Sequence, residues 1–287
     1  MATKKEDAPA QPRVLSDEER KAIQQRIQSK IQKMENLDEY DRVKILLTGP
    51  SGSRKSSFAA AFPRPLIALT EMQAVRAIKK WGNKDLSVFL IKTYQDILDF
   101  QAIASAPNIG QKFDTIVCDS LTDMQRIVRE HFTSQQTKRN DVTDMETWGV
   151  VGNKMEKFIR TVRDCRCHVV LLTLDDEKHV KDQGVLHRPA LDGRLKNELK
   201  QFVQAVGYTW RKEMPSGEYR YQISFELDES YTTKRDHALD AVEPMEPEYL
   251  LAKMLGQEVP ADVQARVDAW REFGQEDKEK KENQVSF

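Results

Sequence analysis

The chain has few cysteines and no long apolar run, and both shortages exclude whole classes of protein. Three cysteines among 287 residues are too few for a disulfide framework. The pair Cys165-x-Cys167 has no second ligand pair, so no zinc site is predicted there. No apolar run approaches the roughly 18–20 residues that span a bilayer, and the first thirteen residues lack the apolar centre of a signal peptide. We therefore expect a cytoplasmic protein with reduced thiols and no membrane contact.

The chain also lacks an excess of charge of either sign. Its formal net charge is −1, although 32% of the residues are charged. No overall attraction draws such a chain to nucleic acid, so DNA binding would need a local basic patch. With 39% hydrophobic residues, 287 residues suffice for one large α/β domain plus extensions.

Residues 43–58, VKILLTGPSGSRKSSF, are the most informative stretch of the chain. An apolar strand-like run ends in a glycine-containing turn, and Lys-Ser-Ser opens a helix, in the order of the phosphate-binding P-loop motif G-x-x-x-x-G-K-[ST]. Backbone N–H groups and the helix N-terminus would hold nucleotide phosphates. Lys55 would neutralise the β- and γ-phosphates of ATP, and Ser56 would bind Mg²⁺. The predicted nucleotide-binding residues are Gly49, Pro50, Ser51, Gly52, Ser53, Arg54, Lys55, Ser56 and Ser57.

Arg54 departs from the motif, because it stands where the last glycine belongs. If this position needs a positive φ, a residue with a side chain costs on the order of 1 kcal/mol there. Two alternatives to a working ATPase therefore stay open. One is a P-loop fold with weakened or lost ATP turnover, and the other is a strand–turn–helix that only resembles the motif.

Strand-like and helix-like segments alternate after this motif. The predicted strands are 44–48, 65–69, 87–91, 114–120 and 168–172, and the predicted helices include 71–80, 93–104, a helix ending near 137, and 150–163. This alternation predicts an α/β fold with a mostly parallel sheet that is covered on both faces. Between Phe202 and Tyr231, two strand-like runs flank Pro-Ser-Gly and predict an antiparallel hairpin at one sheet edge.

Two acidic residues stand at the ends of predicted strands. Asp119 closes the strand 114–120, where a carboxylate would face the ligand crevice and hold Mg²⁺ through water. The alternative is that Asp119 caps the next helix. Glu71 follows the strand 65–69 and could orient or deprotonate an attacking water. The alternative for Glu71 is an acidic residue in the first turn of the helix 71–80.

These motifs, in this order, resemble the RecA-like ATPase core, and more closely the small phage-encoded RecA-like ATPases grouped with single-strand annealing recombination proteins. The resemblance covers roughly residues 43–242, with the P-loop and the Asp119-Ser120 strand its most specific parts. It implies that Glu71 is the catalytic base, and that Lys234 and Arg235 reach the γ-phosphate of a neighbouring protomer in a homo-oligomer. Thr173-Leu174-Asp175 is a poor match to the polar γ-phosphate sensor of that family.

Three further features bear on DNA or metal binding. The polar loop from Asp175 to Gly193 lies where RecA-like proteins carry a mobile DNA-binding loop, and a solvated hairpin is the alternative. The segment Lys138-Arg139-Asn140 could be a companion loop, and Trp148 could stack on a base or pack in the core. His179 and His187 have no Cys or third His at ligand spacing, so no metal site is predicted around them.

The chain is predicted to consist of five segments. These are a disordered tail over 1–13, a helical extension over 14–40, the RecA-like core over 41–242, a small helical part over 243–273 and a charged tail over 274–287. The helical extension opens with a capping box at Ser16. Its apolar stripe comprises Ile23, Ile27, Ile31 and Met34.

The resemblance implies an ATP-binding and ATP-hydrolysing phage-type recombination protein, with ATP and Mg²⁺ as cofactors. Such a protein acts on single-stranded DNA as an oligomer in the cytoplasm of a bacterial host, beside phage recombination or replication proteins. A degenerate P-loop protein with a structural or regulatory role is the alternative. A motor or loader ATPase for replication or packaging also stays open, because the core motifs are shared by all of these.

Overall fold

This computed structural model describes residues 16–31, 42–81, 85–136, 142–180, 184–214, 216–227 and 229–284. The chain divides into two units, residues 1–41 and 42–287. The first contains α1 (Asp17–Gln28), which opens with the predicted capping box between Ser16 and Glu19. No residue of α1 is buried, and Ile27 and Ile31 of the predicted stripe are 53% and 73% exposed. Met34 and the predicted tail over 1–13 lie outside the described residues.

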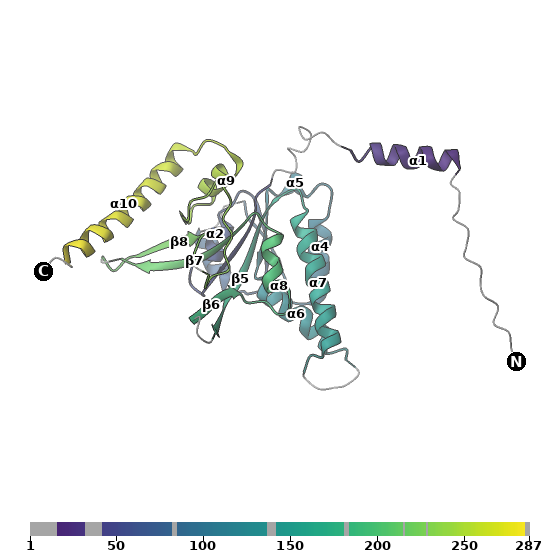
Figure 1. Cartoon of the computed structure of the whole chain (residues 1–287), viewed down its shortest axis with the longest axis horizontal. Helices are drawn as coiled ribbons and strands as arrows, with labels where there is room; N and C mark the ends of the chain where they lie inside the picture. Colours follow the sequence, from purple (N-terminus) through teal and green to yellow (C-terminus); the bar gives the residue numbers. More distant parts are fainter. Residues whose placement is uncertain are drawn as a thin grey trace. The chain divides into compact units, whose positions relative to one another are not determined.

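The second unit is a sheet with helices on both faces (Figure 1). Its strands are β1 (Lys44–Gly49), β2 (Pro65–Leu69), β3 (Ser87–Leu90), β4 (Thr115–Asp119), β5 (His168–Val180), β6 (Gly184–Pro189), β7 (Ala205–Glu213), β8 (Tyr219–Ser224) and β9 (Val242–Pro244). Its helices are α2 (Lys55–Ala60), α3 (Ala74–Trp81), α4 (Tyr94–Ala104), α5 (Ile109–Lys112), α6 (Leu121–Thr133), α7 (Met145–Arg163), α8 (Leu195–Glu198), the 3₁₀ turn η3 (Leu199–Gln201), α9 (Pro247–Leu255) and α10 (Ala261–Gln284).

The strand order is β3-β2-β4-β5-β1-β7-β8-β9, with β6 paired to β5. Along this order, the six strands β3, β2, β4, β5, β1 and β7 are parallel to one another. β6, β8 and β9 are antiparallel to the strands that they pair with. The predicted α/β fold with a mostly parallel sheet is therefore confirmed. The predicted hairpin consists of β7 and β8, but β7 is parallel to β1, so only β8 and β9 form the antiparallel edge.

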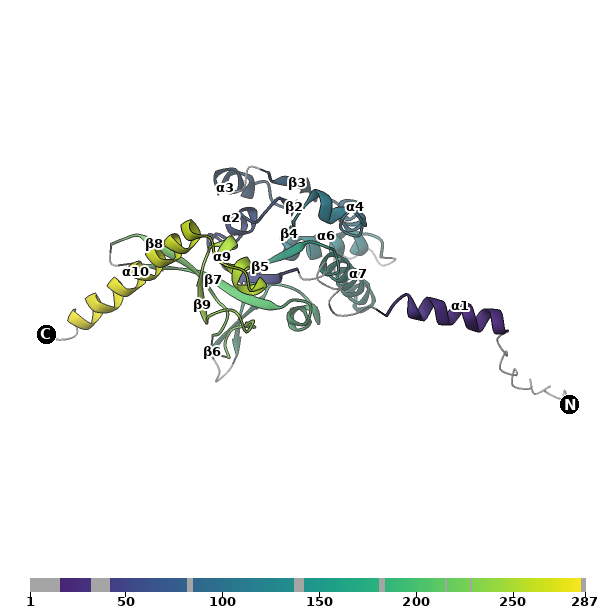
Figure 2. The same cartoon turned by 90° about the horizontal axis from the view of Figure 1, so that it is seen from above.

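Two apolar layers enclose the sheet, and they explain why its central strands read as unbroken apolar runs. One layer is built with α4, α6 and α7, which contribute Phe100, Met124 and Phe158. The opposite layer is built with α2, α3 and α9, which contribute Phe58, Ile78 and Leu250. Figure 2 shows the two helix groups on either side of the strands. This arrangement leaves the C-terminal ends of the parallel strands for the loops that carry polar side chains.

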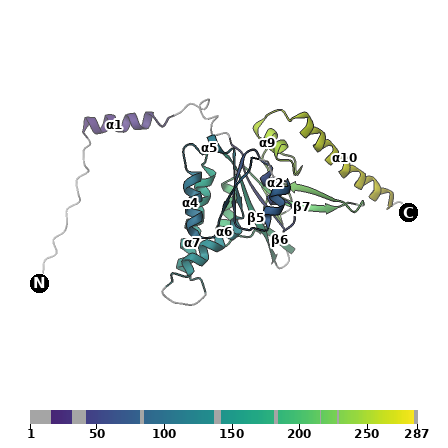
Figure 3. The ribbon, with the colours of Figure 1, turned by 180° about the vertical axis from the view of Figure 1, so that it is seen from behind.

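The C-terminal helices lie on the side of the antiparallel edge (Figure 3). Trp270 of α10 donates from Nε1 to the Tyr221 carbonyl of β8 at 3.0 Å, and the Arg220 guanidinium lies 3.6 Å from the centre of the Trp270 ring. The helix continues to Gln284, so the predicted boundary between residues 273 and 274 falls inside α10.

Candidate functional site

The turn between β1 and α2 is packed against β7. A Cβ atom on Gly49 would clash with the carbonyl oxygen and hydroxyl of Thr209, so this close approach of two strands requires glycine. Ser53 is held from the same side, because its Oγ lies 2.7 Å from Thr209 Oγ1. Since β1 lies between β5 and β7 in a parallel arrangement, the turn stands at the C-terminal edge of the sheet, as predicted.

Arg54 has a left-handed backbone conformation, with φ 67° and ψ 18°. The positive φ expected before the lysine is thus confirmed, and a residue with a side chain costs about 1–2 kcal/mol there. The Arg54 guanidinium lies 3.7 Å from the centre of the Tyr221 ring. A cation–π contact of this kind stabilises by about 0.5–1 kcal/mol at an exposed site, and so offsets part of the backbone strain.

Lys55 begins α2 and turns its amine back into the loop. Its Nζ donates to the Gly49 carbonyl at 2.6 Å, to the Pro50 carbonyl at 2.9 Å and to Ser53 Oγ at 3.3 Å. Burial lowers the pKa of Lys55 to about 8, although the carboxylates of Asp119 and Asp175 act to raise it. The amine is therefore held at the mouth of the loop, and the carboxylates of Asp119 and Asp175 compensate its charge.

Asp119 is the last residue of β4, and its Oδ2 is buried without a hydrogen-bond partner. Burial raises the pKa of Asp119, whereas the Ser56 hydroxyl and the Lys55 charge lower it. The alternative role as a helix cap is not observed, because Ser120 is the N-cap of α6 and accepts from the Asp123 N–H. An uncompensated buried carboxylate oxygen beside a P-loop serine is suited to a cation.

Glu71 lies after β2 and three residues before α3 begins at Ala74. It is therefore not a first-turn residue of that helix, and the predicted helix start at residue 71 was wrong. Partial burial raises the pKa of Glu71, and so do a hydrogen bond with Asp123 and the charges of Asp123 and Asp119. A carboxylate with a raised pKa near a strand end is a candidate proton acceptor.

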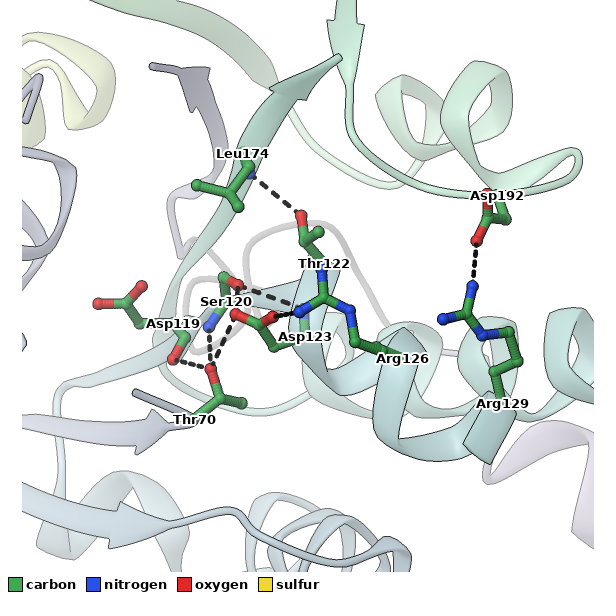
Figure 4. Close-up of polar contacts among 9 residues, drawn as sticks. All are labelled: Thr70, Asp119, Ser120, Thr122, Asp123, Arg126, Arg129, Leu174 and Asp192. Carbon is green, nitrogen blue, oxygen red and sulfur yellow. Dashed lines mark hydrogen bonds and ion pairs between the residues drawn. The ribbon is translucent and has the colours of Figure 1, made fainter. Parts of the chain in front are cut away.

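Asp123 is a residue whose part in the site the sequence did not indicate. It accepts from Ser120 Oγ at 2.8 Å and from Arg126 Nη1 at 2.8 Å, and Thr70 Oγ1 lies 3.4 Å from its Oδ2. Figure 4 shows these contacts where β2, β4 and α6 meet. The only signal in the sequence was the spacing Ser120-x-x-Asp123, which is also that of an ordinary helix cap.

The same network reaches β5. The Leu174 N–H donates to Thr122 Oγ1 at 3.1 Å, and Arg129 forms an ion pair with Asp192 at 3.6 Å. Thr173 is buried, and its hydroxyl lies 2.9 Å from that of Thr48. The ends of β1, β4 and β5 are thereby held at fixed spacing around the loop.

A cavity of about 390 Å³ opens between these strand ends and α3. Nine of the predicted site residues line it, so the structure brings them together: Ser51, Gly52, Ser53, Arg54, Lys55, Ser56, Ser57, Glu71 and Asp119. The remaining lining residues are Gln73, Ala74, Ala77, Ser120, Thr173 and Leu174. Its walls include the cations of Arg54 and Lys55 and several hydroxyl groups, which suit a polyanionic ligand.

Lys234 and Arg235 do not line this cavity. Lys234 Nζ donates to the Val203 carbonyl at 2.7 Å, and Arg235 forms an ion pair with Glu226 at 3.0 Å. Trp148 of α7 is half-buried against the core, with the Arg129 guanidinium 5.7 Å from the centre of its ring. The segment Lys138-Arg139-Asn140 lies outside the described residues.

The predicted loop from Asp175 to Gly193 is largely a hairpin. β5 continues through Asp175 to Val180 and pairs antiparallel with β6. This is the geometry of the solvated hairpin that the sequence left as an alternative to a mobile loop. Residues 181–183 at its tip are outside the described part of the chain.

A mostly parallel sheet with a lysine-bearing phosphate loop after β1, and an acidic residue that closes β4 on the far side of β5, has the arrangement of P-loop ATPase domains. The family described as AAA domain matches residues 41–237, and the chain belongs to this family.

Two solved structures show limited similarity. One is a prototypical ATPase from the type III secretion system of pathogenic bacteria, with 11% identity and a TM-score of 0.38, over 58% of this chain and 52% of that one. The other is the assembled ATPase EscN from the type III secretion system of enteropathogenic E. coli, with 11% identity and a TM-score of 0.41, over 58% and 43%. The similarity thus spans about half the length of those proteins.

No curated protein matches the sequence. Among the described residues, no helix is both long and apolar enough to cross a membrane.

Proposed function

We propose that this chain binds ATP with Mg²⁺ in the cavity at the P-loop and hydrolyses it. One observation carries the proposal: Lys55, Ser56, Asp119 and Glu71 line the same cavity, and Asp119 Oδ2 is buried there without a partner. A cation with its water shell would satisfy that oxygen. The residues present therefore fit the metal that this class of site employs.

Each side chain has a separate task in this proposal. Lys55 releases the loop carbonyls and donates to the β- and γ-phosphates, and the N–H groups of residues 51–56 hold the phosphate oxygens. Ser56 and Asp119 hold Mg²⁺, which when bound neutralises the charge that develops on the phosphates. Glu71 accepts a proton from the attacking water, and the nearby Asp123 charge keeps the pKa of Glu71 raised.

The wider role that we propose is that of a phage-type recombination ATPase that acts on single-stranded DNA as a homo-oligomer in a bacterial cytoplasm. Its support is the resemblance of residues 43–242 to that group. In this role Lys234 and Arg235 act on the nucleotide of a neighbouring protomer. Both side chains make contacts within their own chain, so assembly would have to redirect them.

The alternative is a P-loop protein without turnover, and Arg54 is the observation that favours it. Its backbone has the left-handed conformation that strains a residue with a side chain. Lys55 also already satisfies the loop carbonyls. A protein of this kind would bind nucleotide weakly and serve as a structural or regulatory partner.

Phosphate release in the presence of Mg²⁺–ATP separates the two functions, measured with and without single-stranded DNA. We expect turnover that falls to background in Lys55→Ala and in Glu71→Gln, and that rises with DNA. Equal turnover in the wild type and both variants would come from a contaminating ATPase. The structural or regulatory role would then be the one that remains. Turnover without a response to DNA would retain the ATPase and remove the recombination role.

Mixing variants tests the role of neighbouring protomers. Arg235→Ala is the better partner for Lys55→Ala, because Lys234 also holds the Val203 carbonyl and its loss could disturb the fold. If Arg235 acts on a neighbour's nucleotide, a mixture of the two variants regains part of the wild-type rate. An unchanged rate in the mixture, with a monomeric mass in ATP by light scattering, would identify a chain that works alone.

A further inference from the structure

The hairpin formed by β5 and β6 carries a second cluster of acidic and histidine side chains. Asp175, Glu177 and His187 each offer one ligand atom, and these atoms lie within 4.8 Å of one another. The pairing of the strands produces this cluster, because Glu177 stands directly opposite His187 and Asp175 lies two residues before Glu177 on the same face. We propose that these three residues bind a divalent transition metal, distinct from the Mg²⁺ at the P-loop.

The Asp175 carboxylate points to a missing ligand. Its side chain is only 5% exposed. Oδ2 is satisfied by the Tyr208 hydroxyl at 2.8 Å and by His187 Nδ1 at 2.7 Å, but Oδ1 is buried and has no hydrogen-bond partner. An unsatisfied buried carboxylate oxygen is costly, and a cation is the partner that satisfies it best.

The His187 ring is fixed in position before any ligand arrives. It stacks on the Tyr231 ring, with centroids 4.5 Å apart and planes 6° from parallel. Its backbone N–H donates to the Ser230 carbonyl, and its carbonyl accepts from the Thr232 N–H. Such outer contacts orient a metal-binding imidazole and limit the rearrangement that binding requires.

Glu177 is the residue of this cluster whose side chain is free to rotate. It is exposed, and among the described residues no ion pair or side-chain hydrogen bond engages it. Two ligands bound at roughly 2.1 Å from a metal lie at most about 4.2 Å apart. The three ligand atoms lie within 4.8 Å of one another, so rotation of an exposed glutamate is sufficient to bring them to that spacing.

The donor set selects the class of metal. One imidazole and two carboxylates suit Zn²⁺, Mn²⁺ or Co²⁺ better than Mg²⁺, which prefers oxygen and keeps its waters. Three protein ligands leave coordination positions for water or for a further group. The site adjoins the P-loop cavity, because β5 runs from Thr173 and Leu174 in its wall directly into Asp175.

Titration with Co²⁺, in the absence of nucleotide and Mg²⁺, tests the proposal. We expect visible d–d absorption that saturates at one Co²⁺ per chain, and a Zn²⁺ competition that removes it. His187→Ala and Glu177→Gln should each weaken Co²⁺ binding at least about tenfold. Tyr208→Phe, which keeps the ring but removes the hydroxyl that orients Asp175, should weaken it less.

Three controls isolate the cluster. His237 is exposed beside Asp236 at 3.3 Å, so His237→Ala removes a histidine–aspartate pair at the surface and should leave Co²⁺ binding unchanged. Lys55→Ala should bind Co²⁺ at least as tightly as the wild type, because it removes an ammonium charge that interacts with Asp175, and this result separates the site from the proposed ATPase. Thiolate charge-transfer absorption in the near ultraviolet would assign the metal to Cys165 and Cys167. The proposal would be overturned by that absorption, by a lack of Co²⁺ binding, or by equal Co²⁺ affinity in the wild type, His187→Ala and Glu177→Gln.

Discussion

The neighbouring strands β4 and β5 carry similar carboxylates, Asp119 at the end of β4 and Asp175 within β5, and the two have different surroundings. Asp119 and Asp175 each have one buried oxygen without a hydrogen-bond partner, and both act to raise the pKa of Lys55. Around Asp119 stand the Ser56 hydroxyl and the loop lysine, whereas around Asp175 stand an imidazole and a phenol. Strand topology therefore sets where a carboxylate lies, and its neighbours set which cation it can hold.

The two ends also differ in how they are connected. At the end of β4, the Asp119 carbonyl accepts from Thr70, which follows β2, and the next residue, Ser120, donates to Asp123 of α6. Asp123 and Asp119 in turn act on the pKa of Glu71. Asp175 of β5 is joined to β7 by Tyr208, and His187 of the adjoining β6 stacks on Tyr231 in the segment before β9. We infer that Asp119 serves hydrolysis and that Asp175 belongs to the metal cluster of the β5–β6 hairpin.

The largest effect is expected from the proton acceptor on the β4 side. Glu71→Gln keeps the size of the side chain but removes its basicity, so hydrolysis should slow by roughly 10²-fold or more while ATP affinity stays close to the wild-type value. Single-turnover hydrolysis and calorimetric ATP binding give the two quantities. A wild-type hydrolysis rate in Glu71→Gln would leave this residue without a catalytic role.

Asp123→Asn tests how the Asp123 charge acts on the pKa of Glu71. The Asp123 charge helps to raise the pKa of Glu71, so its removal should lower that pKa and move the acid limb of the rate profile to lower pH. We expect a smaller rate loss than in Glu71→Gln. An unshifted pH profile would show that Asp123 only caps α6.

Replacing each of the two carboxylates by an amide tests directly whether Asp119 and Asp175 belong to different sites. Asp119→Asn should lower Mg²⁺-dependent turnover by about 10–100-fold, the scale for groups that hold a metal through an outer contact, and should leave Co²⁺ binding intact. Asp175→Asn should do the reverse, with its main loss in Co²⁺ affinity. Turnover at several Mg²⁺ concentrations and a Co²⁺ titration measure both. Equal losses of both activities in both variants would mean that the two ends form one site.

Lys55 interacts with both carboxylates, and its titration makes ATP affinity depend on pH. Its pKa of about 8 means that the free protein loses the ammonium charge as the pH rises through 8, whereas bound phosphate would favour the charged form. ATP affinity, measured without Mg²⁺, should therefore fall by up to about tenfold per pH unit above pH 8. Lys55→Ala should bind at least about tenfold more weakly at pH 7 and should lose this dependence.

The sequence predicted the β4 side much better than the β5 side. The P-loop, Lys55 and Asp119 are recognisable because each depends on a local strand–turn–helix pattern. Asp175, Glu177 and His187 were not grouped, because their proximity depends on the register of β5 against β6. A search for metal ligands that is limited to cysteine and histidine spacing also overlooks carboxylates.

The same distinction explains what else the sequence left out. The antiparallel hairpin of β7 and β8 was predicted correctly, but the parallel pairing of β7 with β1 was not foreseen, because it depends on the whole sheet. The interaction of Asp123 with Glu71 joins a helix start to a distant strand end, and no local pattern encodes it. Contacts between segments far apart in sequence were the ones that the sequence did not reveal.

The smallest effect is expected at Arg54, where strain and stacking nearly cancel. Arg54→Gly removes about 1–2 kcal/mol of left-handed strain, but it also removes the stacking on Tyr221, about 0.5–1 kcal/mol, and makes the unfolded chain more flexible. Arg54→Ala loses the stacking and keeps the strain. Arg54→Gly should therefore be close to the wild type in unfolding free energy, and more stable than Arg54→Ala by about 1 kcal/mol.

ATP binding then decides what Arg54 does for function. Because its guanidinium lies over Tyr221, we expect Arg54→Gly to raise ATP affinity or turnover by a few-fold at most, through relief of the loop backbone. Tyr221→Leu removes the stacking partner without changing the loop, and provides the matched control. Weaker ATP binding in Arg54→Gly, with wild-type binding in Tyr221→Leu, would mean that the guanidinium leaves the tyrosine and contacts phosphate, because charge-assisted contacts of that kind outweigh the strain.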